Sequence, residues 1–248
     1  MEEKYVRNRI YVTENEQELI KNFPILIGGC GIGSNIAECA LRFGFENLTL
    51  VDGDRIEESN LNRQNYTAQD ISHYKSETLY KRLKTINPSA DIRYMTEYIH
   101  RENANSIIQN HKAAINALDF SSDIPLYFDA KCRENNINVL HPYNLGWAGL
   151  VAVITPHSAK LESITDKDFN ELEMVRYVLR DLQLKGRPYH WLENTLNEYT
   201  NENVKISPPQ LSIASWTVAA TCTHLLYLLA TNKEVNIFPE YYLRSAAS

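Results

Sequence analysis

Cysteine is scarce in this sequence, and its distribution matches no familiar metal-binding pattern. The 248 residues include four cysteines, which are Cys30, Cys39, Cys132 and Cys222. No two of them form a Cys-x-x-Cys pair, and none has a histidine at the spacing of a zinc finger. We therefore expect no zinc site, and we expect a reducing, cytoplasmic location.

The sequence also has no low-complexity linkers and no excess of positive charge, and we expect no signal peptide. Its first ten residues, MEEKYVRNRI, are charged and contain no apolar stretch of the kind that directs secretion. The formal net charge of -6 argues against nucleic acid as a partner. One apolar run, at residues 211–230, is nearly long enough to cross a bilayer, but its Ser, Thr and His side chains would be expensive in lipid. We expect this run to be a buried core helix or a dimer-interface helix, and we expect no membrane partner.

Apolar runs and helical patterns alternate through residues 23–156. The run FPILI, at residues 23–27, is short, apolar and followed by glycines, which is typical of a buried strand. Further strands are expected at 47–52, 91–99, 113–119, 137–144 and 149–156, with helices at 34–43, 74–86, 103–111 and 125–136. This alternation predicts an α/β fold with a Rossmann-like, doubly wound, mostly parallel sheet.

The pattern changes after Pro156 to a charged, helical stretch. Thr165 followed by Asp168 is a loose form of capping box, which predicts the start of a helix. Its apolar stripe would lie on the core and consists of Leu172, Val175, Leu179 and Leu182. The sequence SPP at 207–209 breaks the chain before the apolar run, and a short strand is expected in the tail.

The motif GGCGIGS, at residues 28–34, joins the first expected strand to the first expected helix. Backbone N–H groups and the positive end of the helix meet there, which suits a phosphate. Asp52 ends the second strand 19 residues after Gly33, where an acidic side chain normally holds a ribose hydroxyl. NAD and ATP both carry that ribose, so these features indicate a nucleotide without distinguishing the two.

Cationic residues follow directly after the expected ribose site. The segment DGDRIEESNLNRQ covers residues 52–64, and Lys75 lies on the next helix. A hydride-transfer cofactor needs no such cations beyond its pyrophosphate loop. A triphosphate that is cleaved does need them, because fixed Arg and Lys groups and a divalent metal stabilise the charge that develops on the leaving pyrophosphate.

With these motifs the sequence resembles the ThiF/MoeB/HesA adenylyltransferases, whose fold is shared by the ubiquitin-activating enzymes. The resemblance covers residues 5–156 and is densest in GCGIGS, LTLVDGDRIEESNLNRQ, YKSETLYKRLKTINP and INALD. It implies a ThiF/MoeB-type sheet with a helical C-terminal segment, and an enzyme that uses ATP to convert a carboxylate into an acyl-adenylate. The implied substrate is the C-terminus of a ubiquitin-like or sulfur-carrier protein, or of a peptide.

The resemblance also implies roles for residues around the nucleotide. Gly28, Gly31 and Gly33 would form the phosphate loop, and Asp52 would bind the ribose of ATP. Asp54 would either assist the metal or satisfy backbone groups of its turn, and the sequence leaves this choice open.

The implied catalytic groups follow in the next loops. Asn60, Arg63 and Gln64 would line the triphosphate, and Arg63 and Lys75 would neutralise it. Asp119, at the end of INALD, would hold Mg²⁺ near the α-phosphate. Members of this family are commonly homodimers in which an N-terminal arginine reaches the partner's site, and either Arg7 or Arg9 fits that pattern. We favour Arg7 because of its spacing from Tyr5.

The sequence departs from the family pattern in its cysteines. Cys30 stands where the phosphate loop usually has a further glycine, and its side chain is a potential obstacle to ATP. The two Cys-x-x-Cys pairs that hold zinc in many members have no counterpart, so residues 157–206 are expected to build the crossover segment instead. No cysteine stands at an obvious position for thioester transfer.

One domain is expected, with an N-terminal arm at 1–22, a nucleotide-binding core at 23–156, the helical crossover segment at 157–206, and a C-terminal helix and tail at 207–248. Three other functions stay open at this point. A dehydratase that cyclises a modified adenosine of tRNA shares the fold and also adenylylates a carboxylate. A pseudo-enzyme that binds nucleotide without turnover would explain Cys30 and the missing zinc motif. An NAD-dependent oxidoreductase rests on the glycine loop alone.

Overall fold

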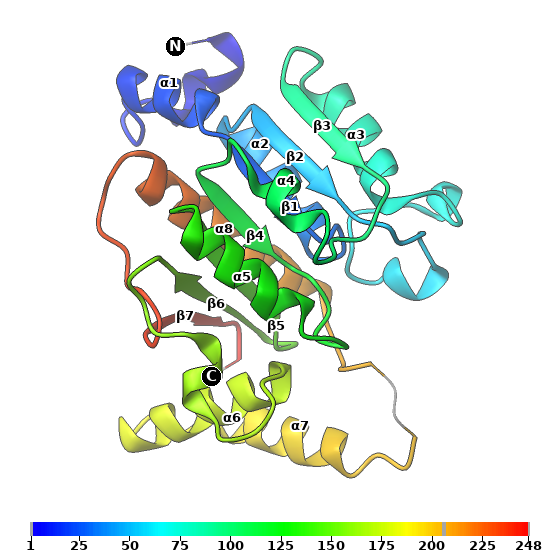
Figure 1. Ribbon diagram of the computed structural model, residues 1–248, viewed down its shortest axis with the longest axis vertical. Coiled ribbons are helices and arrows are strands. Elements are labelled where there is room, and N and C mark those ends of the chain that lie inside the picture. Colours follow the sequence, from blue (N-terminus) through cyan, green and yellow to red (C-terminus); the bar gives the residue numbers. More distant parts are fainter. Residues whose placement is uncertain (1, 205–206, 248) are drawn as a thin grey trace.

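The computed structural model describes residues 2–204 and 207–247 and has a seven-stranded sheet at its centre (Figure 1). The strands are β1 Ile25–Gly28, β2 Asn47–Val51, β3 Asp91–Met95, β4 Ala113–Asn116, β5 Asn138–Asn144, β6 Ala148–Ile154 and β7 Tyr241–Ser245. They lie in the order β3-β2-β1-β4-β5-β6-β7. The first five are parallel, and β6 and β7 add two antiparallel strands at one edge. The predicted α/β fold with a mostly parallel sheet is confirmed.

Helices cover both faces of this sheet (Figure 1). The α-helices are α1 Glu14–Asn22, α2 Gly33–Phe43, α3 Lys75–Ile86, α4 Ala104–Ile108, α5 Ile124–Glu134, α6 Glu171–Leu184, α7 His190–Thr200 and α8 Ser212–Ala230. Short 3-10 turns are η1 Glu3–Asn8, η2 Glu58–Asn60, η3 Ala68–Asp70 and η4 Leu161–Ile164. Helices α2, α3 and α8 contribute to one apolar cluster, and α4, α5 and α6 to the other.

The central strands are apolar along their whole length because both of their sides are covered. In β1, Ile25 and Ile27 belong to the cluster with α2 and α8, whereas Leu26 belongs to the cluster with α5. Alternate residues of a strand point to opposite faces, so a strand covered on both faces needs an uninterrupted apolar run. This requirement explains the sequence ILIG.

The chain reverses its direction of winding between β1 and β4. From β1 it proceeds outward through β2 to β3, and then it returns to β4 on the other side of β1. The loops after β1 and β4 therefore separate in opposite directions and leave a crevice at the carboxyl ends of the strands. Ligands of doubly wound sheets bind at this switch point.

Several elements are shorter in the structure than the sequence predicted. Strand β1 begins at Ile25 because Phe23 closes helix α1. Strand β3 ends at Met95, whose register partner Val51 is the last residue of β2, so residues 96–99 have no strand beside them. Strand β4 ends at Asn116 and helix α4 covers only five residues. Asp119 therefore lies in a loop.

The predicted start of the crossover helix was wrong. Helix α6 begins at Glu171, and the side chain of Asn170 caps it by accepting the N–H groups of Leu172 and Glu173. Thr165 lies five residues before Asn170, in the loop after η4. The buried stripe is also rotated from the predicted one: Leu172 and Leu179 lie at its margins, and its centre consists of Met174, Val175, Val178 and Leu182. Residues 205–206 of the predicted crossover segment lie outside the described residues.

The N-terminal arm is folded against the core. Helix α1 begins with a capping box between Thr13 and Glu16, and the buried hydroxyl of Tyr5 donates a 2.7 Å hydrogen bond to Glu46. Glu46 directly precedes β2, so the arm lies near the end of the sheet where the strands begin (Figure 1). This is the end opposite to the crevice.

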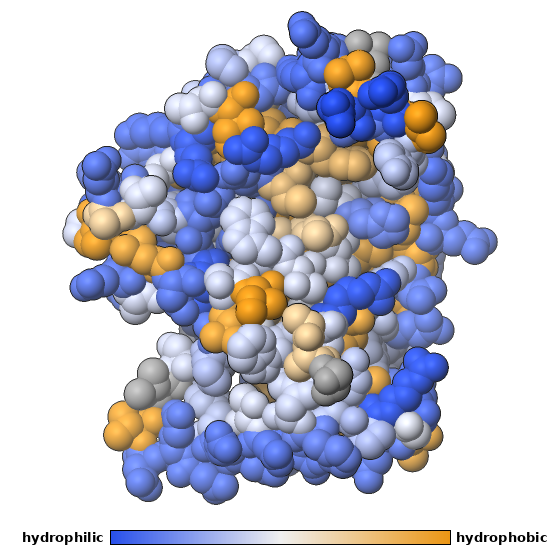
Figure 2. Space-filling model, turned by 180° about the vertical axis from the view of Figure 1, so that it is seen from behind, coloured by the Kyte–Doolittle hydropathy of each residue, from blue (hydrophilic) through white to orange (hydrophobic). Residues whose placement is uncertain are grey.

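Helix α8 is the one helix among the described residues that is long and apolar enough to cross a membrane. Its inner side packs against α2 and β6 and buries Ala214, Val218, Cys222 and Leu225. On its outer side, Ile213 and Trp216 are exposed. Figure 2 shows the face of the molecule on which α8 lies, and pale and orange surface crosses the middle of this face. The prediction of a core helix is confirmed for the inner side of α8.

Candidate active site

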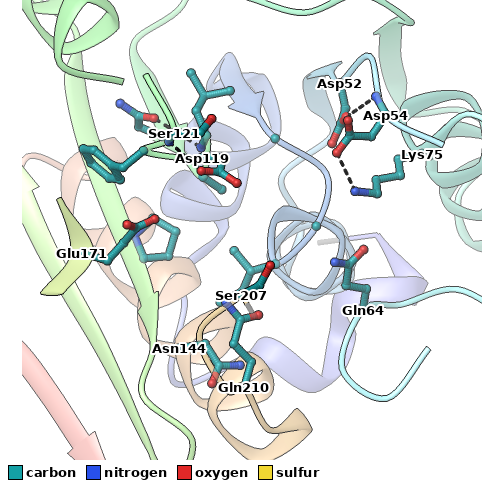
Figure 3. A pocket seen from close by; sticks show the side chains of 18 of the residues that line it. Asp52, Asp54, Gln64, Lys75, Asp119, Ser121, Asn144, Glu171, Ser207 and Gln210 are labelled. Carbon is teal, nitrogen blue, oxygen red and sulfur yellow. Dashed lines mark hydrogen bonds and ion pairs between the residues drawn. The ribbon is translucent and has the colours of Figure 1, made fainter. Parts of the chain in front are cut away.

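A cavity of about 1080 Å³ lies at the carboxyl ends of the parallel strands, at the switch point between β1 and β4. Its walls come from the glycine loop, the loops after β2 and β4, the end of β5, the first turns of α6, and the segment before α8. Figure 3 shows Asp52, Asp54 and Lys75 on one side of it and Asp119 and Glu171 on the other. The cavity is large for a single small ligand, since most ligand pockets measure about 300–1,000 Å³.

Most residues to which the sequence analysis assigned a role meet in this cavity. Those that line it are Gly31, Asp52, Asp54, Asn60, Arg63, Gln64, Lys75 and Asp119. Gly28 and Gly33 flank the glycine loop as the last residue of β1 and the first of α2. Arg7 and Arg9 do not line it. Both are exposed on the arm, near the opposite end of the sheet.

Asp52 is fixed at the end of β2 by two backbone groups. The N–H of Cys30 donates to its Oδ2 at 2.6 Å, and the N–H of Asp54 donates to its Oδ1 at 2.7 Å. Burial raises the pKa of this carboxyl above its ordinary value, although Lys75 and both backbone donors oppose the change. The side chain is thus held rigidly between the glycine loop and the loop after β2.

Lys75 begins helix α3 and points into the cavity. Its side chain is only 10% exposed, and its Nζ lies 2.8 Å from Oδ2 of Asp54. Burial alone would raise the pKa of Asp54, but the ion pair with Lys75 and a 2.8 Å hydrogen bond from the Tyr98 hydroxyl hold it below its ordinary value. Asp54 therefore positions Lys75, a role that the sequence analysis did not consider.

The glycine loop makes its closest approach at Gly29, which the sequence analysis did not select. Gly29 has a φ of +88°, and a Cβ atom built there would lie 2.3 Å from the carbonyl oxygen of Ala117. Only glycine fits this position, because both the backbone angle and the neighbouring carbonyl exclude a side chain. The pair of adjacent glycines at 28–29 was the available signal.

Cys30 does not obstruct the cavity. Its side chain is completely buried in the apolar cluster with Ile36, and only its backbone faces Asp52. Burial raises the pKa of the thiol well above its ordinary value, so a nucleophilic thiolate is disfavoured. Packing in the loop accounts for this residue.

The SNLNRQ segment contributes amide and guanidinium groups near the glycine loop. The Nε of Arg63 donates to Oε1 of Gln210 at 2.5 Å, which ties this segment to the chain before α8. Gln64 packs where a side chain on Gly31 would lie, and its Oε1 is a buried acceptor without a partner among the described residues. Both side chains belong to residues that line the cavity.

Asp119 lies in the loop after β4, on the same side of the cavity as Glu171 (Figure 3). The N–H of Ser121 donates to its Oδ1 at 2.7 Å. Within residues 2–204 and 207–247, no group of three or more His, Cys, Asp or Glu could hold a metal ion. A single carboxylate fits Mg²⁺, which usually takes one or two protein carboxylates together with substrate phosphates and water.

The far side of the cavity contains polar residues for which the sequence predicted no catalytic or binding role. His141 on β5 is 1% exposed, and its Nε2 lies 2.7 Å from Oδ2 of Asp129. This pairing gives His141 a structural role inside the protein. Tyr143 and Glu171 also line the cavity. No local sequence motif identifies Tyr143 and Glu171 as cavity residues, because they come from β5 and α6, which are brought together only by tertiary packing.

Comparison with known proteins relates the whole chain to one family. The model of the ThiF family matches residues 5–241. A tRNA threonylcarbamoyladenosine dehydratase of Haemophilus influenzae is 30% identical over 174 residues, which cover 65% of this chain and 66% of the relative. The sulfur carrier protein ThiS adenylyltransferase of Bacillus subtilis is 26% identical over 161 residues, covering 62% of this chain and 48% of the relative. The chain thus spans about half to two thirds of these relatives.

Solved structures share the fold at lower sequence identity. E. coli MccB crystallised with ATP matches with a TM-score of 0.67 and 15% identity, and the match covers 93% of this chain and 65% of MccB. The fold and the family model agree over nearly the full length. The chain therefore belongs to the ThiF family.

Proposed function

We propose that this protein is an ATP-dependent adenylyltransferase that activates a carboxylate. The observation that carries the proposal is the placement of Lys75, Asp52 and Asp119 around one cavity at the switch point of the sheet. The glycine loop closes one side, and Asp52 is positioned to hold a ribose. The large volume leaves room for a second substrate beside the nucleotide.

The proposed reaction is a displacement at the α-phosphorus of ATP. A carboxylate oxygen of the substrate forms a bond to this phosphorus, the bond to the β-phosphate oxygen breaks, and pyrophosphate leaves with the bonding electrons. Arg63 and Lys75 stabilise the negative charge that moves onto pyrophosphate. Mg²⁺ held by Asp119 would supply charge neutralisation at the phosphates.

The C-terminus of a peptide, or of a ubiquitin-like or sulfur-carrier protein, is the substrate we favour. Support comes from similar proteins: the Bacillus subtilis relative is an adenylyltransferase of the sulfur carrier protein ThiS. MccB, which shares the fold, has been crystallised with ATP and with the peptide MccA. We further propose a homodimer in which the partner's Arg7 completes the site.

A second candidate is a dehydratase that acts on threonylcarbamoyladenosine of tRNA. The 30% identity to the Haemophilus influenzae enzyme favours this alternative. The net charge of -6 opposes it, because tRNA binding depends on a basic surface. Pyrophosphate exchange with a peptide carboxylate and with threonylcarbamoyladenosine separates the two candidates.

Lys75→Ala tests the proposal directly. We expect carboxylate-dependent ATP–pyrophosphate exchange to fall about a hundredfold to a thousandfold, because a fixed charge at the transition state is lost. Lys81→Ala is the matched control, since Lys81 lies on the same helix but forms a surface ion pair with Glu77. It should exchange at the wild-type rate.

Calorimetric titration with ATP and Mg²⁺, and separately with NADH, complements this assay. Binding of ATP that Lys75→Ala weakens supports adenylylation. If wild-type protein binds ATP but exchanges with no carboxylate, a nucleotide-binding pseudo-enzyme replaces the proposal. Binding of NADH alone would indicate an oxidoreductase.

A further inference from the structure

The segment before α8 forms part of the cavity wall and is tied to two other segments. Ser207 and Gln210 line the cavity, and Figure 3 shows Gln210 close to Asn144. The side chain of Asn144, at the end of β5, donates to the carbonyl of Leu211 at 2.8 Å and accepts from its N–H at 3.3 Å. The side chain of Asn62 donates to the carbonyl of Gln210 at 3.2 Å. These contacts hold the backbone of the segment, whichever side chain stands at position 210.

The guanidinium of Arg63 is held through two of its three nitrogens. Its Nε donates to Oε1 of Gln210 at 2.5 Å. Its Nη1 donates to the carbonyl of Ser59 at 2.7 Å and to Oδ1 of Asn62 at 2.8 Å. Nη2 has no hydrogen-bond partner in the part of the chain that the structure describes. Because the guanidinium is planar and its donors form a rigid fork, fixing two nitrogens also fixes the third.

Gln210 differs from the other two acceptors because it comes from a distant part of the chain. Ser59 and Asn62 lie within four residues of Arg63, so they move with the SNLNRQ segment. Gln210 lies 147 residues away, on a segment that Asn144 holds independently. Its contact therefore fixes Arg63 relative to the rest of the cavity. Without this contact the long side chain regains torsional freedom, and ordering it again when a ligand binds costs affinity.

Arg63 lines the cavity and carries a charge that no carboxylate of the described residues neutralises, whereas Lys75 is paired with Asp54. Its Nη2 is free to bind phosphate oxygens, for which a guanidinium is well suited. We propose that Gln210 is a positioning residue for the triphosphate of ATP, which fixes Arg63 so that Nη2 binds the β- and γ-phosphates. The inference rests on the proposed function and adds that the segment before α8 sets the affinity for these two phosphates.

Nucleotide affinities test this role without turnover. Gln210→Met keeps the length of the side chain and removes the amide oxygen that accepts from Arg63. Calorimetry with ATP and Mg²⁺, and separately with AMP, gives the dissociation constants. We expect Gln210→Met to weaken the binding of ATP about fivefold to tenfold, because Arg63 must then be ordered on binding. The affinity for AMP should stay within about twofold, because AMP lacks the β- and γ-phosphates, whereas a merely distorted cavity would bind both nucleotides more weakly.

A double-mutant cycle shows whether Gln210 acts through Arg63. Arg63→Ala alone should weaken the binding of ATP more than Gln210→Met does. When Gln210→Met is added to Arg63→Ala, the affinity for ATP should change by less than about twofold, because no guanidinium is left to position. Losses that add up independently would mean that Gln210 contacts the nucleotide itself, and they would overturn the positioning role.

Two further variants complete the experiment. Gln210→Ala removes the same acceptor with a different side chain and should repeat the selective loss of affinity for ATP. Both variants at position 210 should fold, because the backbone contacts of the segment with Asn62 and Asn144 remain. Gln183→Met is the matched control, since Gln183 is exposed on α6 and does not line the cavity, and it should bind ATP as the wild type does.

The outcomes separate the positioning role from the proposed function. Unchanged ATP affinity in Gln210→Met or in Arg63→Ala would overturn the positioning role and leave adenylylation standing. Tighter binding by Gln210→Met would also overturn it, because Gln210 would then compete with the phosphates for Arg63. The expected losses of ATP affinity in a protein that exchanges pyrophosphate with no carboxylate would support the positioning role and overturn adenylylation. Failure of the wild type to bind ATP would overturn both.

Discussion

At the scale of single residues, the cavity depends most on Gly29. The residue combines a positive φ with a backbone that passes close to the carbonyl of Ala117. These are separate constraints, since the first concerns only the local chain and the second a neighbouring loop. Gly186 shares the first constraint, with a φ of +67°, but has open space around it.

Gly29→Ala should therefore be far more harmful than Gly186→Ala. The strain of a positive φ is about 1–2 kcal/mol for a residue with a Cβ, and we expect this loss of unfolding free energy for Gly186→Ala. Gly29→Ala should lose more than that and should also abolish ATP binding, because the glycine loop must shift away from Ala117. Chemical denaturation and calorimetry with ATP measure the two effects. Equal destabilisation by the two substitutions would mean that the loop adapts easily.

Local spacing in the sequence accounts for some of the cavity residues but not for the contacts between them. Asp52, Lys75 and Asp119 line one cavity because Asp52 follows β2, Lys75 begins α3 and Asp119 lies in the loop after β4. The contact of Asp54 with Lys75 was not foreseen, since it depends on how the loop after β2 folds back onto α3.

At the scale of elements, Glu38 joins helix α2 to helix α3 and to Asn65. The side chain belongs to α2, and its Oε2 accepts from Arg82 on α3 at 2.6 Å and from Asn65 at 2.5 Å. Arg42 of α2 donates to its Oε1. Asn65 directly follows the SNLNRQ segment, so this network holds Arg63 and Gln64 in position.

Glu38→Gln should lower the free energy of unfolding by about 1–2 kcal/mol near neutral pH, a value for hydrogen bonds to a charge that are partly open to solvent. Burial raises the pKa of Glu38, but Arg82, Asn65 and Arg42 outweigh it and hold the pKa below its ordinary value of 4.5. A depressed pKa in the folded state stabilises the protein above the unfolded pKa, and this contribution is lost as pH falls through the folded value.

The difference between wild type and Glu38→Gln should therefore be constant above about pH 5.5 and shrink below about pH 4.5. Urea unfolding at several pH values measures it. Glu77→Gln is the control, because the pair of Glu77 with Lys81 lies at the surface and should contribute little to stability. A difference between wild type and Glu38→Gln that does not change with pH would show that packing, not charge, carries the effect.

At the scale of the whole molecule, the position of the arm decides whether Arg7 can act. Tyr5 binds Glu46 near the amino end of β2, whereas the cavity lies at the carboxyl ends of the strands. Arg7 lies outside the cavity of its own subunit, so a catalytic role requires a second copy of the chain. This geometry is compatible with the proposed homodimer.

Mixing two inactive variants tests this proposal. Arg7→Ala keeps Asp119, and Asp119→Ala keeps Arg7, so a dimer of one subunit of each kind contains one complete site. A random mixture should recover about a quarter of wild-type activity, since half of the dimers are mixed and each has one working site of two. Pyrophosphate exchange after joint refolding measures the recovery. Mixed dimers that form and stay inactive would make the arm structural, and repeating the test with Arg9→Ala decides between the two arginines.

The α/β fold, the glycine loop with the acidic residue that ends β2, and the family could be predicted from the sequence, because they depend on strand–loop–helix units whose spacing is local. Apolar runs, the glycine loop and the acidic residue at the end of β2 lie within a few tens of residues of one another. Only tertiary packing brings Gly29 to Ala117 and Arg63 to Gln210. These contacts join segments far apart in the chain, and their geometry follows from sheet order and from the packing of α8 rather than from any local pattern.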